Sequence, residues 1–210
     1  MPIPSPYPNV PKYLSQDEVR GLFRVITEIR DRALFSLLYL YGLRVSEVSL
    51  LGIADVDLDR HRILIRRVKS GVWGEKPLFR STERMLLRYL EERNGTSSPA
   101  LFPGRGGGPL GKRRVQELFT KYREEAGLLE TATCHSLRHS IATHLLDAGL
   151  PLAFVQDHLG HKNPASTAIY ARISDPARTA FFRRLESSPW VVQPETAVTH
   201  TLPTEKEEEP

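Results

Sequence analysis

Two arginines occur at places in the chain where a phosphate group could be gripped. Arg44 follows Gly42, which ends a strongly apolar stretch that we expect to be a helix. Arg138 lies in the first turn of another predicted helix, where backbone N–H groups point outward and attract anions. A guanidinium is always charged and can hold two oxygens of one phosphate. The pair suggests a site for phosphoryl transfer, although each arginine alone is more simply a surface or salt-bridging residue.

Histidines and a tyrosine supply the other groups that such chemistry needs. His135 precedes Arg138 by three residues, about one helical turn, so both side chains can face the same phosphate. Tyr170 lies nine residues after His161. A phenol has a pKa of about 10, so its attack at neutral pH requires nearby cations and a base. Taken alone, a tyrosine in an apolar helix is more simply a core residue.

A lysine falls in the turn of a predicted hairpin. Residues 62–68 are short and rich in β-branched side chains, which predicts a strand, and residues 75–79 predict the returning strand. Lys69 begins the flexible Ser-Gly turn between them, so its long side chain could reach a leaving group or a groove of DNA. Lys76 is the alternative for this role, and a solvated turn lysine is the plainest interpretation.

Three segments together resemble the tyrosine recombinase (phage integrase) family. They are Tyr41-Gly42-Leu43-Arg44-Val45-Ser46-Glu47-Val48, His135-Ser136-Leu137-Arg138-His139-Ser140-Ile141-Ala142-Thr143-His144-Leu145-Leu146, and Leu159-Gly160-His161 followed by Ala168-Ile169-Tyr170. The family carries an arginine in G-L-R-x-S-E, a lysine in a hairpin turn, H-x-x-R at a helix start, a histidine after L-G, and a tyrosine nine residues later. Over about residues 13–185 all six occur in this order, as Arg44, Lys69, His135, Arg138, His161 and Tyr170.

The resemblance implies a reaction and a role for each residue. Tyr170 would attack a DNA phosphodiester and form a 3′-phosphotyrosyl link, with His135 as the general base. Lys69 would protonate the departing 5′-hydroxyl, and His161 would hydrogen-bond the phosphate. Because the phosphotyrosine keeps the energy of the broken bond, no metal, ATP or other cofactor is expected. The implied function is site-specific DNA recombination, whether integration, excision, inversion or resolution.

Residues beside these positions have weaker assignments. Glu47 could orient the side chain of Arg44 or His135 without itself contacting the phosphate, or it could simply form an ion pair with Arg44. His135 and His139 are four residues apart, as two metal ligands on one helix face would be, but no HExxH motif or third ligand accompanies them, so we expect no metal site. Three cations open a predicted helix against its dipole, which DNA phosphates would explain and a solvated helix end also allows. They are Lys112, Arg113 and Arg114.

The composition is compatible with a DNA-bound protein in a reducing compartment. Residues 188–210 hold five acids and one base, which leaves residues 1–187 with 28 bases, 20 acids and a net charge of +8. Double-stranded DNA would explain this excess, and a solvated basic surface explains it equally well. The single cysteine, Cys134, excludes an internal disulfide and predicts a small buried residue. No apolar run suits a membrane span or a signal peptide, so we expect a cytoplasmic protein.

The predicted elements give a mainly α-helical fold with a small antiparallel β-sheet, as in the catalytic fold of the tyrosine recombinases. Ser15 and Glu18 form a capping box that begins the first helix, which we expect to continue to about Ile29. Further helices are predicted over residues 31–41, 46–51, 82–92, 112–126, 136–148 and 151–159, from Asn163 through Tyr170, and over 176–185.

We expect three segments along the chain: an extended stretch over residues 1–12, a catalytic domain over 13–187, and a disordered acidic tail over 188–210. The helical domain with which most family members clamp DNA is not recognised ahead of residue 13. The start at Met1 favours a naturally short form, resembling the invertases that switch fimbrial genes, over a fragment or a partner-dependent form. The resemblance also implies a homotetramer on two synapsed DNA sites, with an accessory or DNA-bending protein as a further partner.

Two other functions stay open on the sequence. A type IB topoisomerase shares the chemistry but relaxes single sites without a tetramer or a target sequence. A DNA-binding regulator would keep the basic surface, yet it would have no need of the complete catalytic set.

Overall fold

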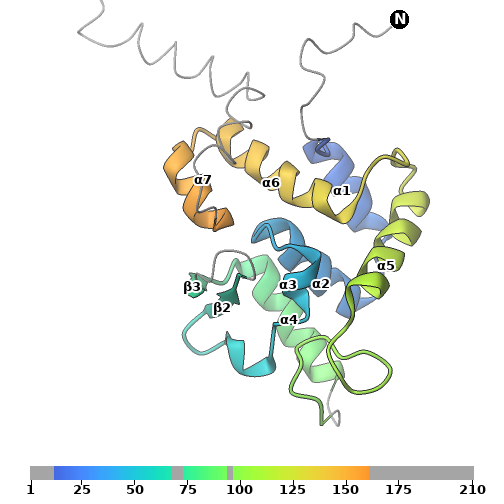
Figure 1. Cartoon of the computed structure of the whole chain (residues 1–210), viewed down its shortest axis with the longest axis vertical. Coiled ribbons are helices and arrows are strands. Elements are labelled where there is room, and N and C mark those ends of the chain that lie inside the picture. The colour runs from blue at the N-terminus through green and yellow to red at the C-terminus, as the bar shows by residue number, and fades with distance from the viewer. Residues whose placement is uncertain (1–11, 68–72, 94–96, 161–210) are drawn as a thin grey trace, which may run out of the picture.

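The fold is described from a computed structural model for residues 12–67, 73–93 and 97–160. Helices make up most of it, and a small antiparallel sheet lies at one side (Figure 1), which confirms the predicted fold class. In chain order the elements are α1 (Gln16–Val25), α2 (Ile29–Leu40), α3 (Val45–Val48), a 3-10 turn (Ile53–Asp55), β1 (Val56–Asp57), β2 (Arg62–Arg66), β3 (Trp73–Pro77), α4 (Arg80–Glu92), α5 (Lys112–Glu125), α6 (Cys134–Asp147) and α7 (Leu152–Leu159).

Helix α2 forms the centre of the fold and packs against α3, α4 and α6. Its polar side chains have partners in the core: Ser36 Oγ lies 2.9 Å from Thr82 Oγ1, and the Tyr122 hydroxyl donates to Asp31 at 2.8 Å. Because these contacts fix α2 from two sides, its carboxyl end is a rigid place on which to build a site. The fully buried apolar residues of α2 are Ala33, Leu34, Phe35, Leu37 and Leu38.

The sheet has the order β1-β2-β3, and both strand pairs are antiparallel. Ile63 pairs with Lys76 and Arg66 pairs with Trp73, so β2 and β3 form a hairpin as predicted. The returning strand begins and ends two residues earlier than predicted, at Trp73 and Pro77. Ile63 and Ile65 are buried, and Arg62, Leu64 and Arg66 are more exposed, as expected for a strand with one face on a core. The sequence did not predict β1, because a strand of two residues carries no periodic pattern.

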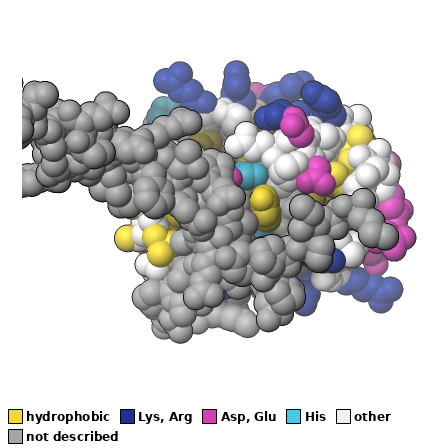
Figure 2. All heavy atoms as spheres, turned by 90° about the horizontal axis from the view of Figure 1, so that it is seen from above, with side chains coloured by type: hydrophobic (Ala, Val, Ile, Leu, Met, Phe, Trp, Pro, Cys, Tyr) yellow, Lys and Arg dark blue, Asp and Glu magenta, His cyan; other side chains and the backbone are white. Residues whose placement is uncertain are grey.

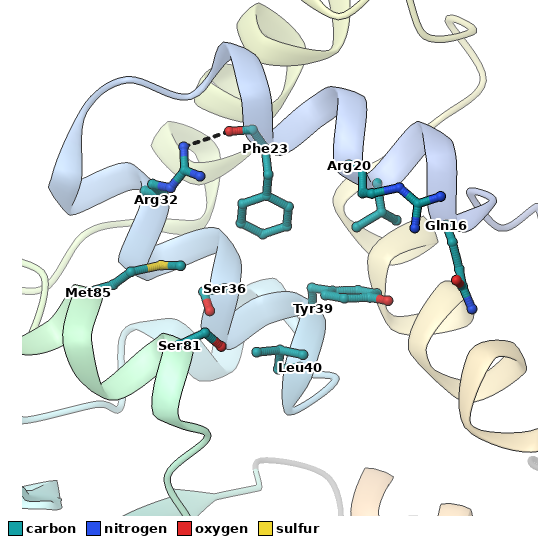
Figure 3. A pocket seen from close by; sticks show the side chains of 10 residues that line it. Gln16, Arg20, Phe23, Arg32, Ser36, Tyr39, Leu40, Ser81 and Met85 are labelled. Atoms are coloured by element: carbon teal, nitrogen blue, oxygen red, sulfur yellow. Dashed lines mark hydrogen bonds between the residues drawn. The ribbon is translucent and has the colours of Figure 1, made fainter. Parts of the chain in front are cut away.

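The prediction that the first helix continues to about Ile29 is wrong. Helix α1 ends at Val25, and the next residue, Ile26, is extended and fully buried. The Phe23 carbonyl, which this ending leaves without a helical partner, accepts from Arg32 of α2 at 2.7 Å (Figure 3). Arg32 also donates to the Ile26 carbonyl, at 3.0 Å. A side chain from the next helix therefore ends α1 early, which local periodicity cannot reveal.

Capping explains where two helices begin. The Ser15 box is present as predicted: its backbone N–H donates to Glu18 at 2.7 Å, and its hydroxyl accepts from the Glu18 N–H at 3.2 Å. Helix α6 begins at Cys134, two residues before the predicted start. There the Thr133 backbone N–H donates to Ser136 Oγ at 3.1 Å, so Ser136 lies inside the first turn instead of capping it.

The remaining predictions have mixed outcomes. Helix α3 is shorter than predicted and ends at Val48. Cys134 is buried as expected, with Sγ 3.9 Å from the Val115 carbonyl, and burial raises its pKa to about 12. No helix in the described part of the chain is long and apolar enough to cross a membrane. The predicted segments over residues 1–11, 163–170, 176–185 and 188–210 lie outside the described residues.

Candidate active site

The candidate site is built around the carboxyl end of α2. The helix ends at Leu40, and its last carbonyls have no partners within the helix. Gly42 then turns the chain with a φ of +54°, a conformation that glycine adopts without steric cost. A Cβ atom at Gly42 would lie 2.4 Å from Leu159 Cδ2, so α7 packs directly against this turn.

Arg44 leaves the turn and is held by Glu47 of α3. Arg44 Nη1 donates to Glu47 Oε1 at 2.9 Å, and the Arg44 backbone N–H donates to Oε2 at 2.8 Å. Burial alone would raise the pKa of Glu47, but the hydrogen bond from the Arg44 N–H and the charge of Arg67 hold it below its usual range. Glu47 is therefore an ionised, buried carboxylate that fixes the direction of a partly exposed guanidinium.

Arg138 extends from α6 into the same place and is almost wholly buried. Its Nη1 donates to the Gly42 carbonyl, and its Nη2 donates to the Leu159 carbonyl at 2.8 Å. The carboxyl ends of α2 and α7 thus meet at one guanidinium. Cations are favoured there because the dipoles of both helices place partial negative charge at these ends.

A third arginine, Arg67, belongs to the cluster and was missed by sequence reasoning. It directly follows β2 and is buried beneath Arg44, with Nη1 2.9 Å from Glu47 Oε2. The alternation of β2 offered a signal, since Arg67 takes the next inward position after Ile63 and Ile65. Its guanidinium also donates to the carbonyls of Tyr41 (2.8 Å), His158 (2.9 Å) and Gly42 (3.3 Å).

The end of α7 packs against the end of α2 and against Arg67. His158 Nε2 lies 2.7 Å from the Leu40 carbonyl, so it donates the bond, and burial lowers the pKa of His158 and favours the neutral ring. Gly160 ends α7 with a φ of +64°, and a Cβ atom there would lie 3.1 Å from Arg67 Cγ. The helix end therefore lies directly on the arginine cluster.

The described part of the site carries an excess of positive charge. Two guanidinium groups, those of Arg44 and Arg67, bind the buried Glu47 carboxylate, and a third, that of Arg138, shares the Gly42 carbonyl with Arg67. Lys76, the alternative to Lys69, already pairs with Asp157 at 2.5 Å, so these two charges offset each other. A site of this kind is suited to an anion with several oxygens, such as a phosphodiester.

Three of the six predicted catalytic residues, Lys69, His161 and Tyr170, lie outside the described residues. The structure does bring together the described chain on either side of two of them. Arg67 is two residues before Lys69, Gly160 is one residue before His161, and the two are in contact. The segments that lead to Lys69 and His161 therefore start from the same point, beside Arg44 and Arg138.

His135 lies in the first turn of α6 with its side chain exposed. Its ring packs edge-on against His139, with centroids 4.5 Å apart and planes at 82°. Arg138, three residues on, points into the buried cluster instead. Within the described ranges, no three His, Cys, Asp or Glu side chains are grouped closely enough to hold a metal ion.

The predicted DNA-binding residues occupy the exposed first turn of α5. Two of them share a partner in the next turn: Arg113 Nε and Arg114 Nη1 lie 3.1 Å and 3.3 Å from the Glu117 carboxylate. Lys112 opens the helix beside them. Seen from above, Lys and Arg side chains lie along the upper edge of the described surface and again at its lower right, with Asp and Glu side chains among and between them (Figure 2).

A separate cavity of about 320 Å³ lies between α1, α2 and α4 (Figure 3). None of the arginines of the cluster lines it. Its walls are mixed, with Arg20 and Arg32 at the polar side and Phe23, Tyr39 and Met85 at the apolar side.

A comparison with known protein families shows to which family a chain with this arginine cluster belongs. Residues 12–176 match the model of the phage integrase family. This chain belongs to the phage integrase family. Tyrosine recombinase XerA of Pyrococcus horikoshii is 36% identical over 169 residues, which cover 79% of this chain and 58% of that protein. Tyrosine recombinase XerC of Chromohalobacter salexigens is 36% identical over 148 residues, which cover 69% of this chain and 49% of that protein.

Solved structures agree with membership of the phage integrase family. The crystal structure of XerA recombinase has a TM-score of 0.77 at 28% identity and covers 90% of this chain and 68% of its own. XerH site-specific recombinase, bound to palindromic difH substrate in a post-cleavage complex, has a TM-score of 0.71 at 25% identity, with 84% and 54% covered. The chain spans between about half and three fifths of the length of the XerA and XerC relatives. The likeness to fimbrial-switch invertases stays a prediction.

Proposed function

We propose that this chain cuts and rejoins double-stranded DNA as the catalytic part of a site-specific recombinase. The observation that carries the proposal is the cluster at the carboxyl end of α2, where Arg44 binds the buried Glu47 carboxylate, Arg138 binds the Gly42 carbonyl, and positive charge is in excess. The family gives the reaction class, since relatives at 36% identity are named tyrosine recombinases.

In the proposed reaction, Arg44 and Arg138 hold the non-bridging oxygens of the scissile phosphate. The Tyr170 oxygen attacks phosphorus, the bond from phosphorus to the 5′-oxygen breaks, and the product is a 3′-phosphotyrosine. His135 takes the phenol proton and Lys69 gives a proton to the departing oxygen. Charge spreads over the phosphate oxygens in the transition state, which the fixed arginines stabilise without further rearrangement.

The reverse reaction rejoins the strands. A 5′-hydroxyl attacks the phosphotyrosine and releases the phenol, so the number of phosphodiester bonds is conserved and no nucleotide or metal cofactor is required. His161 would hydrogen-bond the phosphate in both directions. Arg44 is held by Glu47 and Arg138 by the Leu159 carbonyl, and these protein contacts support a role for both arginines in either direction.

Double-stranded DNA is the proposed partner, and the difH substrate of the related XerH supports this choice. Lys112 and its two neighbours in the first turn of α5 would add phosphate contacts beyond the site. The proposal also includes a homotetramer on two synapsed sites and an accessory or DNA-bending protein as a further partner. The catalytic domain would extend over residues 13–187.

Covalent capture tests the proposed function. The wild-type protein is mixed with nicked duplexes of randomised sequence, from which the cut end diffuses away, and adducts are isolated on a denaturing gel and sequenced. We expect an adduct in excess EDTA, and none from Tyr170→Phe, which removes one oxygen and keeps the ring. The matched control is Tyr13→Phe, the same change at an exposed tyrosine outside the cluster, which should give the wild-type yield.

Two results would contradict the proposal. A wild-type yield from Tyr170→Phe would exclude this tyrosine as the nucleophile, and an adduct that depends on Mg²⁺ would indicate a nuclease. Relaxation of supercoiled plasmids that lack the selected sequence would instead favour a type IB topoisomerase.

A further inference from the structure

Arg67 is a buried arginine of the cluster with four hydrogen-bond acceptors around it. It is only 5% exposed, and its two terminal nitrogens donate to one carboxylate oxygen and three carbonyls. Burial lowers the pKa of Arg67, and the Glu47 charge opposes this effect. A buried guanidinium is costly unless acceptors surround it, and each of these four acceptors belongs to a segment that forms the site.

These acceptors connect separate parts of the chain. One is Glu47, which also binds Arg44, so Arg67 and Arg44 pull on the same carboxylate from two directions. Two are the carbonyls of Tyr41 and Gly42 at the end of α2. The fourth is the His158 carbonyl in the last turn of α7, which ends at Gly160, against the Arg67 side chain.

The position of Arg44 depends on this arrangement. With Arg67 present, one Glu47 oxygen is shared between the Arg67 guanidinium and the Arg44 backbone, and only the other oxygen binds the Arg44 side chain. Without Arg67, the carboxylate would lose a charged donor and turn further toward Arg44. The ends of α2 and α7 would also lose one of the two guanidinium groups that bind both of them, and only Arg138 would remain.

We infer that Arg67 is a positioning residue for the strand-cleavage reaction. In this role Arg67 does not touch the DNA. It fixes Arg44 through Glu47, and it holds the end of α7, from which the chain continues to His161, in place relative to Arg44. A planar fork that reaches four acceptors is required, which a lysine ammonium cannot provide. The inference rests on the proposed function.

Single-turnover cleavage at saturating DNA tests the inference, using a nicked duplex selected in the capture experiment. Arg67→Lys keeps the charge and loses the fork, so we expect the cleavage rate to fall about 100-fold, as displacements of about 1 Å in a site can cause. DNA affinity should change by no more than about 3-fold, because phosphate contacts elsewhere supply most of it.

The matched control is Arg93→Lys, the same substitution outside the site. Arg93 also binds several carbonyls, but these belong to the loop after α4. Its replacement should lower thermal stability. The cleavage rate should stay within about 2-fold of wild type, because distant sites act independently. Its acceptors are the carbonyls of Ser98 (2.6 Å), Ala100 (2.6 Å) and Leu101 (2.7 Å).

A double variant separates positioning from general damage. If Arg67 acts largely through Arg44, then Arg67→Lys should cost much less when Arg44→Ala is already present. Fully additive losses would overturn the inference, and so would equal rates for Arg67→Lys and wild type, or equal slowing by the Arg67 and Arg93 variants. Failure of the proposed function is recognised separately, because the wild-type protein would then form no adduct.

Discussion

Replacing Gly42 by alanine tests the close packing on which the site is built. The substitution adds a single methyl group at a residue with a φ of +54°. It has two separate effects, because the backbone conformation disfavours any side chain and because the new Cβ would lie 2.4 Å from Leu159 Cδ2. No contact this short can persist, so α7 or its leucine must move.

The magnitude follows from these two effects. The left-handed conformation costs an alanine about 1–2 kcal/mol. Forcing an extra methyl group into a packed core costs about 1–3 kcal/mol more, so the total is roughly 2–5 kcal/mol. For a chain of 150–250 residues each kcal/mol lowers Tm by about 2–4 °C. Leu159 is fully buried and packs with Ile141 and Val155, which limits how far it can turn aside.

The matched control is Gly127→Ala. Gly127 has a similar φ of +65°, and no atom lies within 4 Å of its Cβ position, so only the backbone cost of about 1–2 kcal/mol applies. Urea unfolding of the two variants at constant m-value measures the difference, which reports the contact with α7. If Gly42→Ala is no more destabilising than Gly127→Ala, the packing of α7 against this turn is wrong.

Two further predictions concern buried polar groups. Burial lowers the pKa of His158 below its unfolded value of about 6.5, so its contribution to stability is complete above that pH and is lost as the pH falls toward the folded pKa. His158→Gln can still donate to the Leu40 carbonyl but does not titrate. Its free energy of unfolding in urea should therefore fall less steeply than that of the wild type from pH 8 to 5, by up to about 1.4 kcal/mol per pH unit. Parallel curves for the two proteins would contradict this. Tyr122→Phe removes the donor to the buried Asp31 and should cost about 1–3 kcal/mol in urea unfolding, whereas a change within about 0.5 kcal/mol would show that the bond contributes little.

Local signals predicted much of the helical fold. The capping box at Ser15 depends on two residues three apart, and the apolar stretch of α2 is continuous in sequence, so both were found before any tertiary contact was known. The early end of α1 was not found, because the donor that replaces its helical bonds is Arg32 in the next helix.

In the site, too, local sequence signals were found and tertiary contacts were not. Motif spacing singled out Arg44, Glu47 and Arg138, and all three meet at the carboxyl end of α2. Arg67 escaped notice because its acceptors lie between 20 and 91 residues away along the chain, and a lone arginine after a strand is ordinarily a surface residue. The roles assigned to Lys69 and His161 stay predictions.

The donors and acceptors of the cluster differ in how they can change during evolution. Arg67 donates to three main-chain oxygens and Arg138 to two, and every amino acid supplies such an oxygen. Substitution at the residue that owns the carbonyl leaves the oxygen in place as long as the backbone keeps its path, whereas either guanidinium has no substitute among the other side chains. The cluster therefore places no requirement on the side chains in the last turn of α7, where His158 and Leu159 are constrained by their own bonds and packing instead. A library randomised at Arg67 and Arg138 should retain both arginines.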